Sequence, residues 1–86
     1  MPTYFFHMRD DGVLVEDPDG SELADLISAV SEAKLGARSI MAEDIKIGRA
    51  VRPVSIEITD TTNQVLETIT FREVLEELTE GLYAAQ

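Results

Sequence analysis

The residues best suited to chemistry lie in the first apolar run of the chain. His7 is the only histidine, and Arg9 follows two positions later. If this run is a strand, alternate residues share a face, so both side chains lie on the same side of a sheet as Phe5. A histidine that titrates near neutral pH beside a guanidinium could bind an anion or transfer a proton. His7 and Arg9 are therefore candidate ligand-binding residues.

The same residues also have a purely structural interpretation, in which His7 is a partly exposed sheet residue that pairs with a cross-strand acid such as Glu16. Acid–base catalysis needs a pocket and a second positioned group as well as a histidine. The sequence shows no nucleophile spaced from a base, no glycine-rich phosphate loop and no histidine–acid metal pattern. We therefore predict that the chain is not an enzyme and has no catalytic residues.

Acidic residues cluster around two predicted turns, DDG at residues 10–12 and DPDG at residues 17–20. Carboxylate oxygens are the ligands that calcium and magnesium prefer, so a weak cation site is conceivable there. The spacing does not match an EF-hand loop, and aspartate, proline and glycine are favoured in turns for conformational reasons. We expect a solvated acidic surface, with no metal ligand and no cofactor.

Four runs of alternating residues predict strands, at residues 3–9, 13–16, 51–60 and 65–70. The Asp-Gly pair between the first two strongly favours a hairpin. In the first run Tyr4, Phe6 and Met8 form the apolar side, which should face a helix. In the last run the alternation is weaker, because Glu67 falls on the apolar side.

A long amphipathic helix is predicted over residues 25–47, with Asp25 as its N-cap and Gly48 as its C-cap. Its apolar positions recur every three or four residues, and they are Leu23, Leu26, Ile27, Val30, Ala33, Ala37, Ile40, Met41 and Ile45. Such a helix spans about 35 Å, against about 17–20 Å for a typical strand. It should therefore overhang the sheet, bend at Gly36, or be shared with a partner.

A short second helix is predicted after a capping box formed by Thr70 and Glu73. Gly81 is expected to end it, leaving residues 82–86 as a frayed tail. Its inward positions are expected to be Phe71, Val74, Leu75 and Leu78, with Leu82 as a further candidate. The predicted fold of residues 1–86 is a single α+β domain of order ββαββα, an antiparallel sheet with one long and one short helix packed on one face.

Charge is distributed unevenly along this chain of net charge −10. Five bases face two acids in residues 34–52, while the rest of the chain is strongly acidic. An acidic body repels phosphate backbones and anionic membranes, so neither nucleic acid nor membrane is an expected partner. The basic segment should form ion pairs within the chain or with a second copy, and anion binding is the alternative.

The second half of the long helix combines this basic charge with apolar residues that lie off the main stripe. We predict partner binding there, at Lys34, Leu35, Arg38, Ala42, Lys46 and Arg49. The leading hypothesis is a non-catalytic protein-interaction module that forms a homodimer through this helix or a sheet edge. The alternative is that these are ordinary surface residues.

Three features of the sequence bear on where in the cell the protein is expected. There is no cysteine, no basic leader before an apolar core, and no apolar run long enough to cross a bilayer. A cytoplasmic location is the resulting expectation.

Several of these runs together resemble a family of short uncharacterised proteins abundant in rhizobia and related alphaproteobacteria. The most specific part is YFFHMRDDG at residues 4–12, followed by DPDGSEL at residues 17–23 and, later, IEITD at residues 56–60. The chain departs from the family in lacking a glycine in the turn after residue 60, and in having Ala24 where proline is common. The family is a domain of unknown function, so the resemblance implies no activity, substrate or site residue.

A more remote resemblance concerns the order of elements. A hairpin followed by a helix, on an acidic protein, resembles antitoxins of the HicB type, which neutralise a small RNA-cleaving toxin. This analogy at the level of the fold implies an alternative function, a regulator that binds a small basic partner protein.

Overall fold

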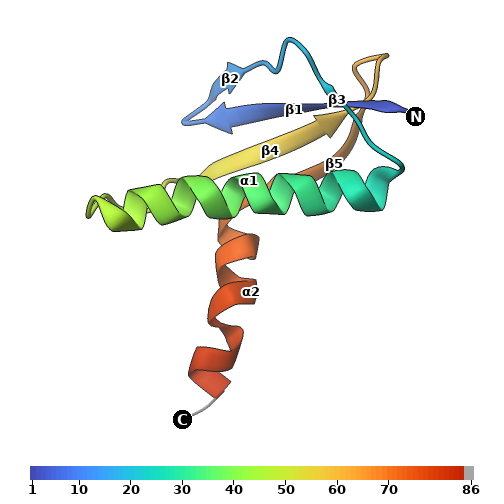
Figure 1. The fold of residues 1–86 in the computed structure, drawn as a ribbon. Coiled ribbons are helices and arrows are strands. Elements are labelled where there is room, and N and C mark those ends of the chain that lie inside the picture. The colour runs from blue at the N-terminus through green and yellow to red at the C-terminus, as the bar shows by residue number, and fades with distance from the viewer. Residues whose placement is uncertain (85–86) are drawn as a thin grey trace.

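An antiparallel sheet with one long helix across one of its faces forms the body of the protein (Figure 1). The computed structural model describes residues 1–84. Its elements are β1 (Thr3–Asp10), β2 (Val13–Val15), β3 (Ser21–Glu22), α1 (Leu26–Lys46), β4 (Val54–Thr59), β5 (Val65–Thr70) and α2 (Phe71–Ala84). The strand order is β2-β1-β4-β5, and the short β3 also pairs with β1. The predicted α+β class is confirmed.

The β1–β2 hairpin forms at the predicted turn. Asp10 lies opposite Val13, so Asp11 and Gly12 alone connect the strands. Both have positive φ, 53° and 79°, as a type I′ turn requires. This turn matches the natural twist of paired strands, which explains why a two-residue signal was sufficient to predict the hairpin.

Helix α1 has the boundaries that its capping residues predict. The Asp25 side chain accepts a hydrogen bond from the Ser28 N–H at 2.8 Å, and Gly48 follows the helix with a φ of 79°. The helix runs unbroken through Gly36, and its C-terminal turns extend past the sheet (Figure 1). Of the three geometries that its length allowed, the overhang is the one observed.

The face that α1 buries is narrower than predicted, although seven of the nine predicted positions are buried or pack against the core. A ladder of small residues at every fourth position, Ala29, Ala33 and Ala37, faces the sheet and continues to Met41. The prediction that Ile27 and Ile45 face inward is wrong, because they are 78% and 62% exposed. Large side chains of the sheet already fill the space between the sheet and α1. The helix can therefore approach the sheet closely only through its alanines, and this contact fixes which side of α1 faces the sheet.

Strands β4 and β5 are joined by a short turn and contain an irregularity that explains the weak alternation of β5. Strand β4 is shorter than the predicted residues 51–60, whereas β5 has the predicted bounds. Ile58 lies opposite Glu67, but Thr59 lies opposite Val65, so Leu66 has no partner in the register. This extra residue is a β-bulge, which changes the side of the sheet on which the following residues lie.

Helix α2 starts with the predicted capping box but then leaves the body. The Glu73 N–H donates to Thr70 Oγ1 at 3.1 Å, and the Thr70 N–H donates to Glu73 Oε1 at 3.0 Å. Phe71 and Val74 are fully buried. Beyond them the helix projects away from α1 and the sheet (Figure 1). The radius of gyration, 13.9 Å, exceeds the about 12 Å expected for a compact chain of this length.

Two predictions for α2 are therefore wrong. Leu78 and Leu82 do not face inward but are 59% and 63% exposed. Gly81 does not end the helix, which continues to Ala84. Of the predicted frayed tail, residues 82–84 are helical and residues 85–86 lie outside the described residues. The cause is the steep angle between the helices, which leaves the body in contact with the first turns of α2 alone.

Candidate functional site

His7 lies on the sheet face opposite α1, where the segment that links β2 to β3 covers it. Its Nδ1 accepts a hydrogen bond from the Asp17 N–H at 3.0 Å, and its Nε2 lies 3.2 Å from Thr59 Oγ1. Because Nδ1 is an acceptor, the neutral ring carries its proton on Nε2 and donates it to the Thr59 hydroxyl. Both ring nitrogens are therefore engaged in holding the covering segment to β1 and β4.

The predicted exposure of His7 is thus wrong, as is its predicted pairing with Glu16. The residue is only 8% exposed, and the Phe5 ring stacks beside it with ring centroids 6.1 Å apart. The reason is the Asp17-Pro18 turn, which folds over the ring from outside the strand. Burial and two engaged nitrogens favour a structural histidine.

Arg9 shares this sheet face with His7 but is paired elsewhere. Its Nε lies 2.7 Å from the Glu57 carboxylate on β4, and this contact raises the arginine pKa through the hydrogen bond and the charge of Glu57. The guanidinium is thus already neutralised by a carboxylate. The structure brings His7 and Arg9 to one face, but their donors are directed to other protein groups.

Asp17 is the residue that holds the covering segment in place, and its role was not predicted from the sequence. One carboxylate oxygen accepts from the Phe6 N–H on β1, and the other accepts from the N–H groups of Asp19 and Gly20, each at 3.2 Å. The carboxylate thereby occupies the edge of β1 between the parts that pair with β2 and β3. An Asp-x-Asp-Gly turn next to a strand is the sequence signal for this arrangement.

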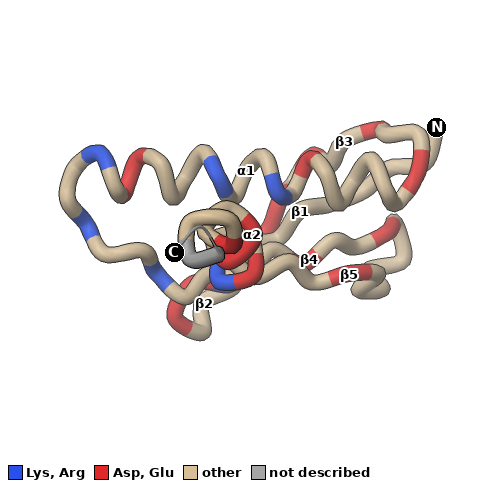
Figure 2. The backbone as a smooth tube through the Cα atoms, turned by 90° about the horizontal axis from the view of Figure 1, so that it is seen from below, with Lys and Arg blue, Asp and Glu red and all other residues tan. Residues whose placement is uncertain are grey.

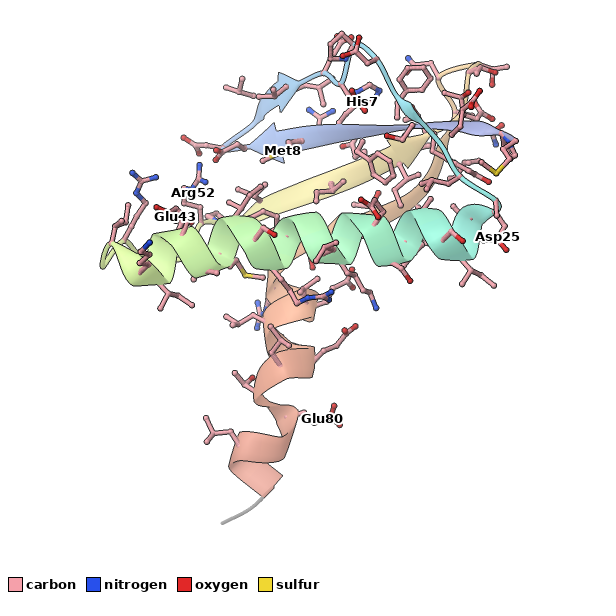
Figure 3. The ribbon with its side chains drawn as sticks, in the orientation of Figure 1. His7, Met8, Asp25, Glu43, Arg52 and Glu80 are labelled. Atoms are coloured by element: carbon pink, nitrogen blue, oxygen red, sulfur yellow. The ribbon has the colours of Figure 1, made fainter. Side chains whose placement is uncertain are left out.

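Gly20 completes the turn because no side chain fits there. Its φ is 70°, and an added Cβ would lie 2.9 Å from a ring carbon of Phe5. The glycine therefore combines a left-handed backbone conformation with a close approach to β1. Figure 3 shows His7 beneath this covering segment.

We expect low pH to destabilise the turn that Asp17 holds in place. Partial burial of the Asp17 carboxyl acts to raise its pKa, but the N–H groups of Gly20, Phe6 and Asp19 and the nearby His7 together hold the pKa below its ordinary value. A carboxyl whose pKa is lowered by folding stabilises the fold above about pH 4 and loses this contribution as the pH falls through the folded pKa. We expect Asp17→Asn to be less stable by about 1–2 kcal/mol at neutral pH, since its single amide oxygen cannot accept both from Phe6 and from the N–H groups of the turn.

Urea unfolding followed by circular dichroism, from neutral pH to about pH 3, measures this effect. The Asp17→Asn variant should lose less stability on acidification than the parent protein. Asp19→Asn is the matched control, because it removes the same charge from an exposed neighbour in the same turn. Equal acid sensitivity of the parent and Asp17→Asn would contradict the assigned role.

The basic segment is partly neutralised by acids of the same chain, as one of its two interpretations predicted. Lys34 Nζ lies 2.8 Å from Glu77 of α2, and Arg49 lies 3.6 Å from Asp44. Arg52 contacts Asp44 at 3.5 Å and also pairs with Asp10. Figure 2 shows these bases along the second half of α1 and the loop that follows it.

Asp44 is a buried carboxylate that the sequence analysis missed. Only 4% of its side chain is exposed, at the end of α1 between Arg49 and Arg52. The signal lay in the helical spacing, because Asp44 follows Met41 by three residues on the same face as the alanine ladder. This carboxylate fixes the loop of residues 47–53 to the end of α1.

The six predicted partner-binding residues separate into two groups. Lys34 and Arg49 are ion-paired within the chain. The other four, Leu35, Arg38, Ala42 and Lys46, are exposed. Within residues 1–84, neither Arg38 nor Lys46 has a carboxylate within 4.0 Å.

Three of these residues continue a regular exposed stripe on α1. Leu35, Arg38 and Ala42 are followed by the exposed Ile45, at the three-and-four spacing typical of a helix-packing seam. On α2, Leu78 and Leu82 continue the buried stripe of Phe71 and Val74 into solvent. We call these six residues, Leu35, Arg38, Ala42 and Ile45 of α1 and Leu78 and Leu82 of α2, the α1–α2 surface.

The leucines of α2 face the side of the molecule toward which the C-terminal half of α1 extends (Figure 3). Glu80 points from α2 toward the side where Asp25 begins α1 (Figure 3). Residues two positions from Glu80 lie about 200° around the helix, so Leu78 and Leu82 face the opposite side. That side lies below the C-terminal half of α1, which carries Ile45.

The chain belongs to a family of proteins that share a domain of unknown function, DUF6894, whose family model matches residues 3–72. The match includes the sheet and α1 and ends at the second residue of α2, so the projecting part of α2 lies beyond it. No curated protein and no solved structure matches the chain. Neither helix, over its described residues, combines the length and apolarity that crossing a bilayer requires.

Proposed function

We propose that this protein is a small, non-catalytic protein-interaction module that binds its partner through the α1–α2 surface. The observation that carries the proposal is the apolar stripe of α2. It is fully buried at Phe71 and Val74, yet Leu78 and Leu82 on the same side are more than half exposed. An amphipathic helix that presents apolar residues at three-and-four spacing to solvent is a common docking element.

The remaining surface of α2 supports this assignment. Its other side carries Glu73, Glu76, Glu77 and Glu80, so the helix has distinct apolar and acidic sides. An isolated projecting helix gains little stability from propensity alone. Packing of Leu78 and Leu82 against a partner would supply the burial that the rest of the chain does not give them.

A non-catalytic role is supported by the contacts of the polar residues on the sheet face opposite α1. His7 uses both ring nitrogens to hold the covering segment, and Arg9 is paired with Glu57. These are the two residues with which acid–base or anion chemistry was considered. Their partners are structural, so the function is better sought on the helices.

A regulator that masks a small basic protein is the second candidate function. The acidic side of α2 favours it, because four glutamates lie within two turns of one exposed helix face. Electrostatic attraction would bring a basic partner to this side, and the leucine stripe would be less important. The two candidates thus place the partner on opposite sides of α2.

Photo-crosslinking at the two sides of α2 tests both candidates. A benzophenone amino acid is introduced at position 82 or position 80 of the whole chain, and the protein is produced in its native cell. The yield of cross-linked product is expected to be higher from position 82 than from position 80. The reverse pattern would favour the basic partner, and no product at either position would contradict an interface on α2.

A further inference from the structure

The partner of the α1–α2 surface can be named from the surface itself. We infer that it is a second copy of this chain, whose α2 packs antiparallel against the first copy's α2. This inference rests on the proposed function and adds the identity of the partner. In such a dimer one patch meets the same patch around a two-fold axis, as in most homodimers.

The apolar part of the surface fits a helix of its own kind. Leu78 and Leu82 lie on the same side as Val74, and Gly81 adjoins that stripe. A glycine within a helix costs about 1 kcal/mol relative to alanine. A Cβ added at Gly81 would meet nothing within 4 Å, so the described part of its own chain gives no steric reason for glycine. Close approach of a second helix would supply one.

Charge selects the antiparallel direction. An axis near Leu78 would place the distal half of one α2 below the C-terminal half of the partner's α1. That distal half carries Glu80, and the C-terminal end of a helix is also the negative end of its dipole. The C-terminal half of α1 offers Arg38 and Lys46, which have no salt bridge in the described part of the chain.

One such contact already exists within a single copy. Lys34 of α1 and Glu77 of α2 lie 2.8 Å apart, so bases of α1 and acids of α2 are compatible neighbours where the helices meet. A two-fold dimer would add a second set of these contacts at Arg38. A basic foreign protein, in contrast, would be repelled by Arg38 and Lys46 on the α1–α2 surface, and on the glutamate side of α2 it would leave the leucines exposed.

Analytical ultracentrifugation of the whole chain, from about micromolar to about millimolar concentration, tests this inference. The parent protein should reach the mass of a dimer. Leu82→Glu should remain a monomer over the same range, because the charge would lie in the apolar contact. Circular dichroism should show unchanged folding, since Leu82 is mostly exposed. A parent protein that stays monomeric, or a Leu82→Glu variant that dimerises like the parent, would overturn it.

Two further variants make the test specific. Val13→Glu is the matched control, because it puts the same charge on an exposed apolar residue of the β2 edge, and it should dimerise like the parent. Loss of the dimer in Val13→Glu, with Leu82→Glu unaffected, would place the interface at the sheet edge instead. Arg38→Glu should weaken the dimer by about tenfold through lost attraction in two symmetric contacts. Unchanged affinity would overturn the antiparallel arrangement.

Failure of this inference can be distinguished from failure of the proposed function. Cross-links from position 82 to a different protein, with a purified chain that stays monomeric, would keep the interface on α2 and overturn the second copy as partner. Absence of cross-links at position 82 together with a monomeric chain would overturn both.

Discussion

Replacing Phe71 with alanine should lower the free energy of unfolding by about 3–5 kcal/mol. The Phe71 ring is fully buried at the point where α2 joins the sheet and α1, in the same cluster as Ile58, Ile69 and Val74. Alanine would leave a cavity that the rigid neighbouring strands cannot fill. A domain of this kind has only about 5–15 kcal/mol of stability, so the variant should lose a large fraction of it.

Urea unfolding measures this loss, and Leu82→Ala provides its control. Leu82 lies on the same helix but is 63% exposed, so its truncation should change the stability of the isolated chain by less than about 0.5 kcal/mol. The comparison tests whether α2 is held only at its first turns. Similar losses for the two variants would mean that the distal part of α2 is packed against the body.

The starts of both helices and the end of α1 could be predicted from the sequence because local residues determine them. Asp25 and Gly48 bound α1, and the pair Thr70 and Glu73 starts α2. In each case the signal and the structure lie within a few residues of each other. The Asp-Gly hairpin belongs to the same class, since positive φ at two adjacent residues is a local requirement.

The width of the buried face of α1 could not be predicted in the same way, because it depends on which side chains the sheet presents. Hydrophobicity favoured Ile27 and Ile45 as core residues, but the sheet requires a close approach that only the alanine ladder allows. His7 is a similar case. Its burial depends on Asp17 and on Thr59, which is 52 positions away in the sequence.

The candidate surface was only partly predictable for a related reason. Leu35, Arg38 and Ala42 lay off the expected core stripe, so they were recognised as surface residues. Ile45, Leu78 and Leu82 have the spacing of a core face and were assigned to the core. The same periodic apolar pattern stabilises a fold or an interface, and only the angle between α1 and α2 shows which of the two applies (Figure 1).

Replacing Asp44 with alanine should lower the free energy of unfolding by about 1–3 kcal/mol. Its carboxylate is almost fully buried between Arg49 and Arg52, and removal would leave the Arg52 Nε buried without an opposite charge beside it. The loss should be smaller than for a wholly buried ion pair, because about a third of the Arg52 side chain remains exposed and Asp10 still pairs with it.

Two variants at the end of α1, where Figure 3 labels Glu43, separate charge from packing in this effect. Glu43→Ala removes the same charge from the exposed adjacent position and should change the stability by less than about 0.5 kcal/mol in urea unfolding. Asp44→Asn keeps the volume of Asp44 but not its charge. If it is as unstable as Asp44→Ala, the arginines need the charge. If it is as stable as the parent, the side chain of Asp44 acts by filling space, and the loop after α1 is held by Arg52 and Asp10 instead.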